Sequence, residues 1–221
     1  MEAYLPFLRG QILFRGMADD EILRLLACFH ARALRFGQAR IVWEFGSQPY
    51  LGIILEGGLM AQQEDSRGNR TILGDFGPGD FLDTCLVSAI KGAQPFFLSV
   101  RAGTAILLLE QQPMLEPCGE NCRCHLLFLR NGAQAMARRE RHLLHKIEVL
   151  SKRTTREKIL SYLAIQSALQ GARHFNVPYT RQELADFLAV DRSAMCTELT
   201  RMQNDGLIRY ERKRFELLGG E

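Results

Sequence analysis

The order of hydrophobic and polar residues divides the chain into two parts with different periods. Between residues 36 and 109, short runs of β-branched, aliphatic and aromatic residues are separated by Gly, Pro and Asp. The runs are RIVWEF, YLGIILEGGLMAQQ, RTILGDF, FFLSVRA and TAILLLE. Short strands separated by turn residues are typical of an antiparallel sandwich or barrel. The pattern therefore predicts an α+β protein that begins with an antiparallel β-barrel, a double-stranded β-helix or jelly roll, over residues 1–117.

From about residue 124 the hydrophobic period becomes that of a helix. Positions spaced alternately by three and four residues form one stripe: Leu126, Leu129, Ala133, Met136, Glu140, Leu143, Ile147 and Leu150. This is the a/d pattern of a coiled coil, and it predicts a dimerisation helix over 118–150 and a parallel or antiparallel homodimer. The charged Glu140 has two open interpretations. Its carboxylate either reaches solvent beside the seam, or it specifies register or contacts a ligand between the protomers.

The C-terminal part predicts two short helices joined by a brief turn. Thr180 and Glu183 form a capping box that begins the first helix, and Asp191 can cap a second helix that runs to Asp205. Four polar residues of the second helix face outward: Arg192, Ser193, Thr197 and Arg201. This arrangement predicts a helix-turn-helix. The alternative is a helix pair that only packs in a core or contacts another protein.

A basic hairpin follows the predicted helix pair. LIRYERKRFELL reads as a wing of two β-prone runs around a basic turn, and residues 151–221 carry 12 Lys and Arg against 9 Asp and Glu. Basic side chains on a wing bind DNA phosphates with little sequence preference. We therefore expect a winged helix-turn-helix DNA-binding domain over 151–221. Its expected DNA contacts are Thr180, Arg181, Gln182, Arg192, Ser193, Thr197, Arg201 and Lys213.

Composition and motifs exclude several other classes. Hydrophobic residues make up 47% and charged residues 24%, and no apolar run is long enough to span a membrane. The N-terminus lacks a signal-peptide pattern, so we expect a cytoplasmic protein with free thiols and no membrane association. Residues 37–110 contain no histidine to hold a cupin-type metal, and P-loop, GxSxG and GxGxxG patterns are absent. The protein is not expected to be an enzyme.

The chain resembles the Crp/Fnr family of bacterial transcription regulators over nearly its whole length. The resemblance rests on GPGDF at 77–81, VRAGTA at 100–105, the seam helix, and RQELADFLAVDRSAMCTELTRMQNDGLI. It implies a cyclic-nucleotide-binding-like sensor domain, a dimer helix, and a winged helix-turn-helix that reads palindromic double-stranded DNA, with RNA polymerase as a further partner. The family's base-reading positions fall on Arg192, Ser193 and Thr197. Many relatives carry an arginine where Thr197 stands, so their half-site cannot be transferred.

The cyclic-AMP cassette of the family is not present here. Members that bind cyclic AMP hold the ribose with a Gly-Glu-Leu run and the phosphate with an Arg-Ser pair, where this chain has Asp83-Thr84-Cys85 and Phe96-Phe97. A phosphate beside two phenylalanines would lack charge-assisted hydrogen bonds, so cyclic AMP is not the expected effector. We expect another small molecule in a pocket formed by Phe81, Asp83, Thr84, Cys85, Phe96, Phe97, Met136 and Glu140. The alternative is that the phenylalanines simply fill the barrel.

The octet CGENCRCH brings together Cys118, Cys122, Cys124 and His125. These residues are candidate metal ligands or redox-active thiols at the head of the dimer helix, and they define an alternative function as a redox- or metal-responsive regulator. Their spacing is not that of a zinc finger. Structural thiols that pack as small apolar groups are the other interpretation.

Overall fold

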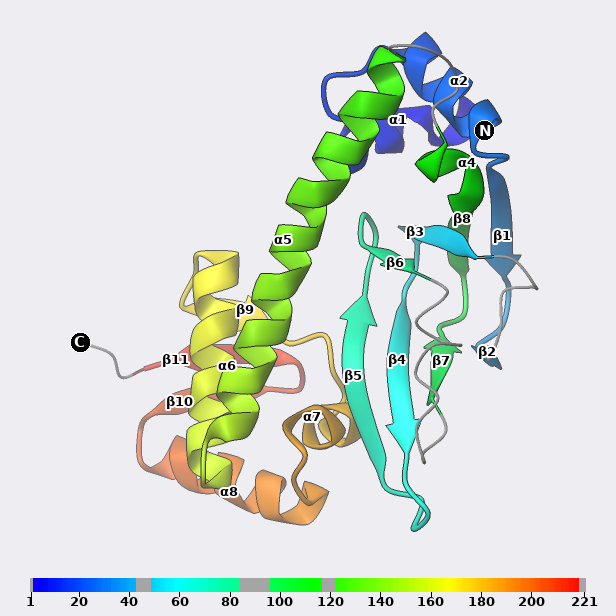
Figure 1. Ribbon diagram of the computed structural model, residues 1–221. Coiled ribbons are helices and arrows are strands. Elements are labelled where there is room, and N and C mark those ends of the chain that lie inside the picture. Colours follow the sequence, from blue (N-terminus) through cyan, green and yellow to red (C-terminus); the bar gives the residue numbers. More distant parts are fainter. Residues whose placement is uncertain (1, 43–48, 84–95, 117–121, 219–221) are drawn as a thin grey trace. The chain divides into compact units, whose positions relative to one another are not determined.

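The computed structural model describes residues 2–42, 49–83, 96–116 and 122–218. The chain forms two compact units, Met1–Arg138 and Arg139–Glu221. Helix α5 (Arg123–Ser151), drawn in green in Figure 1, runs through the boundary between them. None of the described helices is long and apolar enough to cross a membrane.

The first unit contains two four-stranded antiparallel sheets. One has the strand order β1-β8-β3-β6 and the other β2-β7-β4-β5. The strands are β1 (Arg32–Phe36), β2 (Arg40–Val42), β3 (Tyr50–Glu56), β4 (Leu59–Glu64), β5 (Arg70–Phe76), β6 (Phe81–Asp83), β7 (Phe96–Val100) and β8 (Thr104–Glu110). The predicted antiparallel β-domain is therefore confirmed, with the strands in the expected region.

Both sheets contribute to one enclosed apolar core. Ile54 and Ile106 from the first sheet pack with Leu59, Leu98 and other side chains from the second. Successive strand residues point to opposite faces, so the neighbouring side chains of β3 and β8 point to the outer face.

That outer face forms a second core with helices from both ends of the unit. Ile53 and Leu107 pack there with Leu25 and Phe128. The covering elements are η1 (Glu2–Tyr4), α1 (Leu5–Arg9), η2 (Ile12–Phe14), α2 (Asp19–Cys28) and the first turns of α5, and α4 (Gln111–Leu115) follows β8. Because both faces of β8 are buried, TAILLLE reads as a continuous apolar run without alternation.

The second unit packs helices against a small sheet. Its elements after α5 are α6 (Thr155–Gln170), β9 (His174–Asn176), α7 (Arg181–Leu188), α8 (Arg192–Asn204), β10 (Ile208–Glu211) and β11 (Arg214–Leu217). The sheet order is β10-β11-β9, all antiparallel. The predicted wing hairpin is present, but the sheet has a third strand, β9, that the sequence pattern did not predict.

Local signals set the start and end of α6. The Thr154 side chain accepts a hydrogen bond from the Glu157 backbone N–H (3.2 Å), and the Glu157 carboxylate accepts one from the Thr154 N–H (3.0 Å). This reciprocal pair satisfies two amide groups that have no partner inside the helix. Gly171 then ends α6 in the left-handed conformation, with φ +62°. Ile159 and Leu163 on its inner face are buried.

Candidate nucleic-acid interface

Helix α7 begins at the capping box that the sequence predicts. The Thr180 hydroxyl accepts from the Glu183 N–H at 3.2 Å, and the Glu183 carboxylate accepts from the Thr180 N–H at 2.6 Å. Leu184 and Leu188 are fully buried on the inward face. The hydroxyl of Thr180 therefore has a structural role in the free protein, besides any role in binding DNA.

The turn between α7 and α8 is short and accepts a hydrogen bond from α6. Ala189 ends α7 in the left-handed conformation, with φ +50° and ψ +58°, which residues other than glycine adopt only with strain. The Lys158 ammonium group of α6 donates to the Leu188 carbonyl oxygen at 3.2 Å. The turn thus depends on α6 for its position.

Asp191 caps α8 at its N-terminus. Its carboxylate accepts from the Ser193 hydroxyl at 2.5 Å and from the Ala194 N–H at 2.9 Å. These hydrogen bonds favour the ionised form and hold the pKa of Asp191 below its usual value. Helix α8 therefore starts at Arg192, as predicted.

The two sides of α8 differ in character. Met195, Leu199 and Met202 are fully buried on the inner side. The four residues that the sequence predicts on the outer side are all exposed: Arg192, Ser193, Thr197 and Arg201. Arg192 and Ser193 lie in the first turn, where a helix inserted into the major groove contacts base edges. The structure thus brings the four expected contacts onto one exposed helix face.

Arg181 packs on the wing in the free protein. Its guanidinium group lies over the rings of Tyr210 (4.8 Å from the centroid) and Phe215 (5.1 Å). A cation over aromatic faces is stabilised by the ring quadrupole. This contact fixes the start of α7 against the wing sheet.

Two further predicted contacts also have intramolecular partners. The Gln182 side chain donates to the Asp186 carboxylate at 2.8 Å, and the Lys213 ammonium group donates to the Pro178 carbonyl oxygen at 2.7 Å. Both pairs are exposed at the surface. Contacts from these side chains to DNA phosphates would compete with these bonds.

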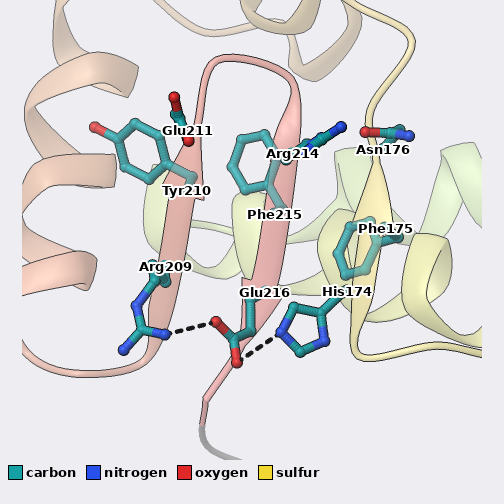
Figure 2. A pocket seen from close by; sticks show the side chains of 9 residues that line it. All are labelled: His174, Phe175, Asn176, Arg209, Tyr210, Glu211, Arg214, Phe215 and Glu216. Carbon is teal, nitrogen blue, oxygen red and sulfur yellow. Dashed lines mark hydrogen bonds and ion pairs between the residues drawn. The ribbon is translucent and has the colours of Figure 1, made fainter.

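The wing sheet carries a row of three aromatic rings (Figure 2). Tyr210, Phe215 and Phe175 are directly paired across β10, β11 and β9, with centroids 5.5 Å and 6.5 Å apart. Beside them, the Glu216 carboxylate bridges Arg209 (3.1 Å) and His174 (3.0 Å). These side chains line a cavity of about 570 Å³.

Arg156 is a positioning residue that sequence reasoning missed. From α6 it donates to the carboxylates of Glu198 (2.5 Å) and Asp205 (2.7 Å), at the middle and the end of α8. The hydrogen bonds to these carboxylates raise the pKa of Arg156, and the bond to Glu198 has the larger effect. Its partners lie 42 and 49 residues away in sequence, so no local pattern could identify them.

Two residues of the predicted effector pocket, Phe81 and Asp83, lie on β6. Phe81 points to the outer face of its sheet, where it packs against the core covered by the N-terminal helices. The neighbouring Leu82 points into the enclosed core. Asp83 accepts a hydrogen bond from the Gln111 side chain at 2.7 Å. Strand alternation therefore places Phe81 and Asp83 outside the enclosed core of the barrel.

The two phenylalanines of the expected pocket, Phe96 and Phe97, are consecutive residues of β7. Leu98 and Val100 fill the enclosed core, so Phe97, which is buried, belongs to the other face of β7. For Phe96 only the backbone is described, and it pairs with Gln63. Thr84 and Cys85 lie outside the described residues. Phe97 is therefore not a lining residue of the enclosed core.

The other two expected pocket residues lie one turn apart on α5. Met136 and Glu140 are both exposed, Met136 to 66%. In the single chain these two residues are part of the exposed stripe of the helix.

The thiol and histidine cluster is only partly assembled in the described part of the chain. The sulfur atoms of Cys122 and Cys124 lie 3.4 Å apart, whereas Cys118 lies outside the described residues. His125 is buried, with Nε2 2.6 Å from the Met114 carbonyl oxygen and its ring edge-on to Phe29. Among the described residues, no three Cys, His, Asp or Glu side chains are arranged to hold a metal ion. His125 thus packs as a core residue in the described part of the chain, and its assignment as a candidate ligand stays a prediction.

Comparison with known proteins agrees with this geometry. Residues 157–219 match the Crp-like helix-turn-helix domain. The chain is 27% identical over 208 residues to the transcriptional activator protein FnrL of Cereibacter sphaeroides, covering 89% of this chain and 79% of that protein.

Solved structures share the fold over nearly the full length. A CooA mutant from Carboxydothermus hydrogenoformans superposes with a TM-score of 0.67 at 15% identity, over 95% of each chain. CLP of Xanthomonas campestris, described as a c-di-GMP responsive global regulator, gives a TM-score of 0.64 at 22% identity, over 92% of this chain and 100% of CLP. The exposed helix face, the wing, the matching helix-turn-helix domain and a relative that matches 89% of the chain together support a DNA-binding transcription regulator of the Crp/Fnr family.

Proposed function

We propose that the protein is a homodimeric, sequence-specific regulator that binds palindromic DNA through α8 and is gated by a small-molecule effector other than cyclic AMP. The observation that carries this proposal is the coexistence of two exposed surfaces. One is the polar outer face of α8, and the other is an apolar stripe along α5.

The stripe on α5 supports dimerisation. Leu126, Leu129, Met136, Leu143 and Ile147 are 44–66% exposed in the single chain. A long row of exposed apolar side chains at heptad spacing is stabilised when a second helix covers it. Pairing two copies of α5 would bury this row and set the distance between the two α8 helices.

The outer face of α8 supports base recognition. The Arg192 guanidinium can donate two hydrogen bonds to a guanine edge, whereas Ser193 and Thr197 can donate or accept with less selectivity. In the free protein the Ser193 hydroxyl donates to Asp191, so it would have to rotate to reach a base. Two such helices about one DNA turn apart fit a palindromic site. RNA polymerase is the expected further partner of the DNA-bound dimer.

The proposed effector differs from cyclic AMP because the phosphate-binding pair of the family is replaced by Phe96-Phe97. CLP is described as responsive to a different cyclic nucleotide. The fold is therefore compatible with effectors other than cyclic AMP, and Phe96-Phe97 in place of the phosphate-binding pair disfavours cyclic AMP.

The first test is DNA affinity as a function of salt. A protein that contacts several phosphates releases counterions on binding, so affinity for a random duplex should fall by roughly 10³-fold or more between 50 and 200 mM salt. Selection from a random-sequence duplex pool should then enrich a palindrome. Affinity that does not change with salt would refute DNA binding as the function.

A second candidate is a thiol-controlled regulator of the same fold, responding through Cys118, Cys122 or Cys124. The observation in its favour is the 3.4 Å separation of the Cys122 and Cys124 sulfur atoms. Titration with oxidants and metals, followed by measurement of DNA affinity, separates this input from a small-molecule effector.

A further inference from the structure

A cavity in the first unit lies between α2 and the head of α5. It has a volume of about 330 Å³ and combines three thiols with three charged side chains. The thiols are those of Cys28, Cys122 and Cys124, and the charged residues are Glu21, Arg24 and Arg123. All three cysteines are reduced thiols in the described part of the chain, and all three are half-buried. The three thiols are therefore partly accessible to small reagents.

Two of these thiols are in direct contact. The Cys122 and Cys124 sulfur atoms lie 3.4 Å apart, close enough for one thiol to donate a hydrogen bond to the other. Side chains two residues apart within an α-helix point to nearly opposite sides. The contact exists because Cys122 precedes Arg123, the first residue of α5, and is not held in helical geometry.

The surroundings distinguish the two thiols. Burial, and next the hydrogen bond with Cys122, raise the pKa of the Cys124 thiol. Cys122 lies at the positive end of a long helix, with the guanidinium groups of Arg24 and Arg123 lining the same cavity. Arg123 is paired with Glu21 and Arg24 with Asp20, so both signs of charge lie near the two sulfur atoms.

We propose that Cys122 and Cys124 form a reversible intramolecular disulfide that disrupts the first turn of α5 and thereby weakens DNA binding. The regulatory part rests on the proposed function. With a hydroperoxide as oxidant, one of the two sulfur atoms attacks a peroxide oxygen as its thiolate and becomes a sulfenic acid, and hydroxide leaves. The other thiol then attacks that sulfur, which forms the S–S bond and releases water. For hydrogen peroxide the sum is two thiols and one peroxide converted to one disulfide and two waters.

Closure of this disulfide has a structural consequence. The sulfur atoms must approach from 3.4 Å to about 2.0 Å, and a link between residues i and i+2 cannot keep helical geometry at its middle residue. That residue is Arg123, which now donates to the Glu21 carboxylate (2.5 Å) and the Gly16 carbonyl oxygen (3.3 Å). Oxidation would break these two hydrogen bonds between α5 and the N-terminal segment. A disulfide strained in this way is readily reduced again.

The chemical test uses the full-length reduced protein. After treatment with hydrogen peroxide, free thiols are alkylated and the peptides are mapped by mass spectrometry. We expect loss of two thiols, a Cys122–Cys124 link, and full recovery with dithiothreitol. Cys122→Ser and Cys124→Ser should each abolish the link, whereas Cys28→Ser and Cys196→Ser should retain it. A predominant link to Cys28 or Cys118 would overturn the proposal.

The regulatory test compares oxidised and reduced protein on one duplex at fixed salt. We expect oxidation to weaken binding by about tenfold or more in the native sequence, and to leave Cys124→Ser unchanged. Circular dichroism of the variants verifies that each one is folded. If the disulfide forms but DNA affinity does not change, the proposed regulation of DNA binding by the disulfide is refuted. Loss of binding by the reduced protein would instead refute the proposed function, so the two failures are distinguishable.

Discussion

Arg156 on α6 donates a 2.5 Å hydrogen bond to Glu198 on α8 and so fixes the recognition helix to the helix that follows α5. A second bond, to Asp205 at 2.7 Å, holds the far end of α8. With two attachment points, α8 is fixed in both rotation and tilt. The exposed residues of its outer face are thereby held in one orientation before DNA is bound.

Substitution of Arg156 by alanine should release this attachment. We expect the melting temperature of the second unit to fall by a few degrees and specific DNA affinity to fall about threefold, because α8 loses orientation while its base contacts remain. Arg153→Ala, which removes an exposed charge from the same segment, is the matched control. Equal losses of specific affinity in the two variants would show that charge, and not positioning, is responsible. Thermal denaturation and fluorescence anisotropy measure the two effects.

Arg192 and Lys213 should differ in the kind of binding they provide. Arg192→Ala should reduce affinity for the selected palindrome by roughly 10- to 100-fold and relax base preference at one position of each half-site. Lys213→Ala should weaken binding to all duplexes similarly and lower the salt dependence by about one phosphate contact. Binding isotherms on the palindrome and on a random duplex at several salt concentrations separate these outcomes. Similar losses on both duplexes for Arg192→Ala would remove it as a base-reading residue.

Features that depend on residues close in sequence could be predicted. The Thr180 and Glu183 capping box and the Asp191 cap act over three residues, and the structure forms both at the expected positions. The antiparallel sheets and the long helix also follow from periodicity alone. Local hydrogen bonding and side-chain period set these features, so a single sequence contains the information.

Features set by long-range packing could not be predicted. The register of β6 against β3 decides which face of the sheet Phe81 occupies, and Phe81 packs against the core formed with the N-terminal helices. Strand β9 forms only because β11 pairs with it across about 40 residues of sequence. A register shift of one residue exchanges the two faces of a strand. The pocket assignment therefore needed the sheet pairing, which the sequence pattern does not contain.

Lys146 should make the second unit more stable at alkaline pH. Burial lowers the pKa of Lys146 from 10.5 to about 8, and its ammonium group lies 4.3 Å from the Phe187 ring centroid. Between these two pH values the unfolded chain binds more protons than the folded one, so the free energy of unfolding rises with pH. Below pH 8 the cost of burying the charge is present in full, and above pH 10.5 it is absent.

Lys146→Met should remove this pH dependence and stabilise the unit at pH 7 by on the order of 2 kcal/mol. Urea unfolding of both proteins from pH 7 to pH 10 measures the difference. Lys152→Met, at a half-buried position just after α5 whose ammonium group pairs with Glu148 at 3.8 Å, should leave the pH dependence unchanged. If the native protein and Lys146→Met gained stability in parallel across this range, another group would be responsible.

The seam of α5 should be essential for specific binding but not for folding. Leu143 is 48% exposed in the single chain, so an aspartate there is solvated in the monomer but would be buried between two helices in the dimer. Leu143→Asp should therefore be monomeric at micromolar concentration by sedimentation, with an unchanged circular dichroism spectrum. A monomer presents one α8 instead of two, so affinity for the palindrome should fall by more than about 100-fold while binding to a half-site persists. Arg141→Asp, also exposed on α5 but off the stripe, should remain dimeric. Tight palindrome binding by a monomeric Leu143→Asp would show that the stripe does not position the two recognition helices.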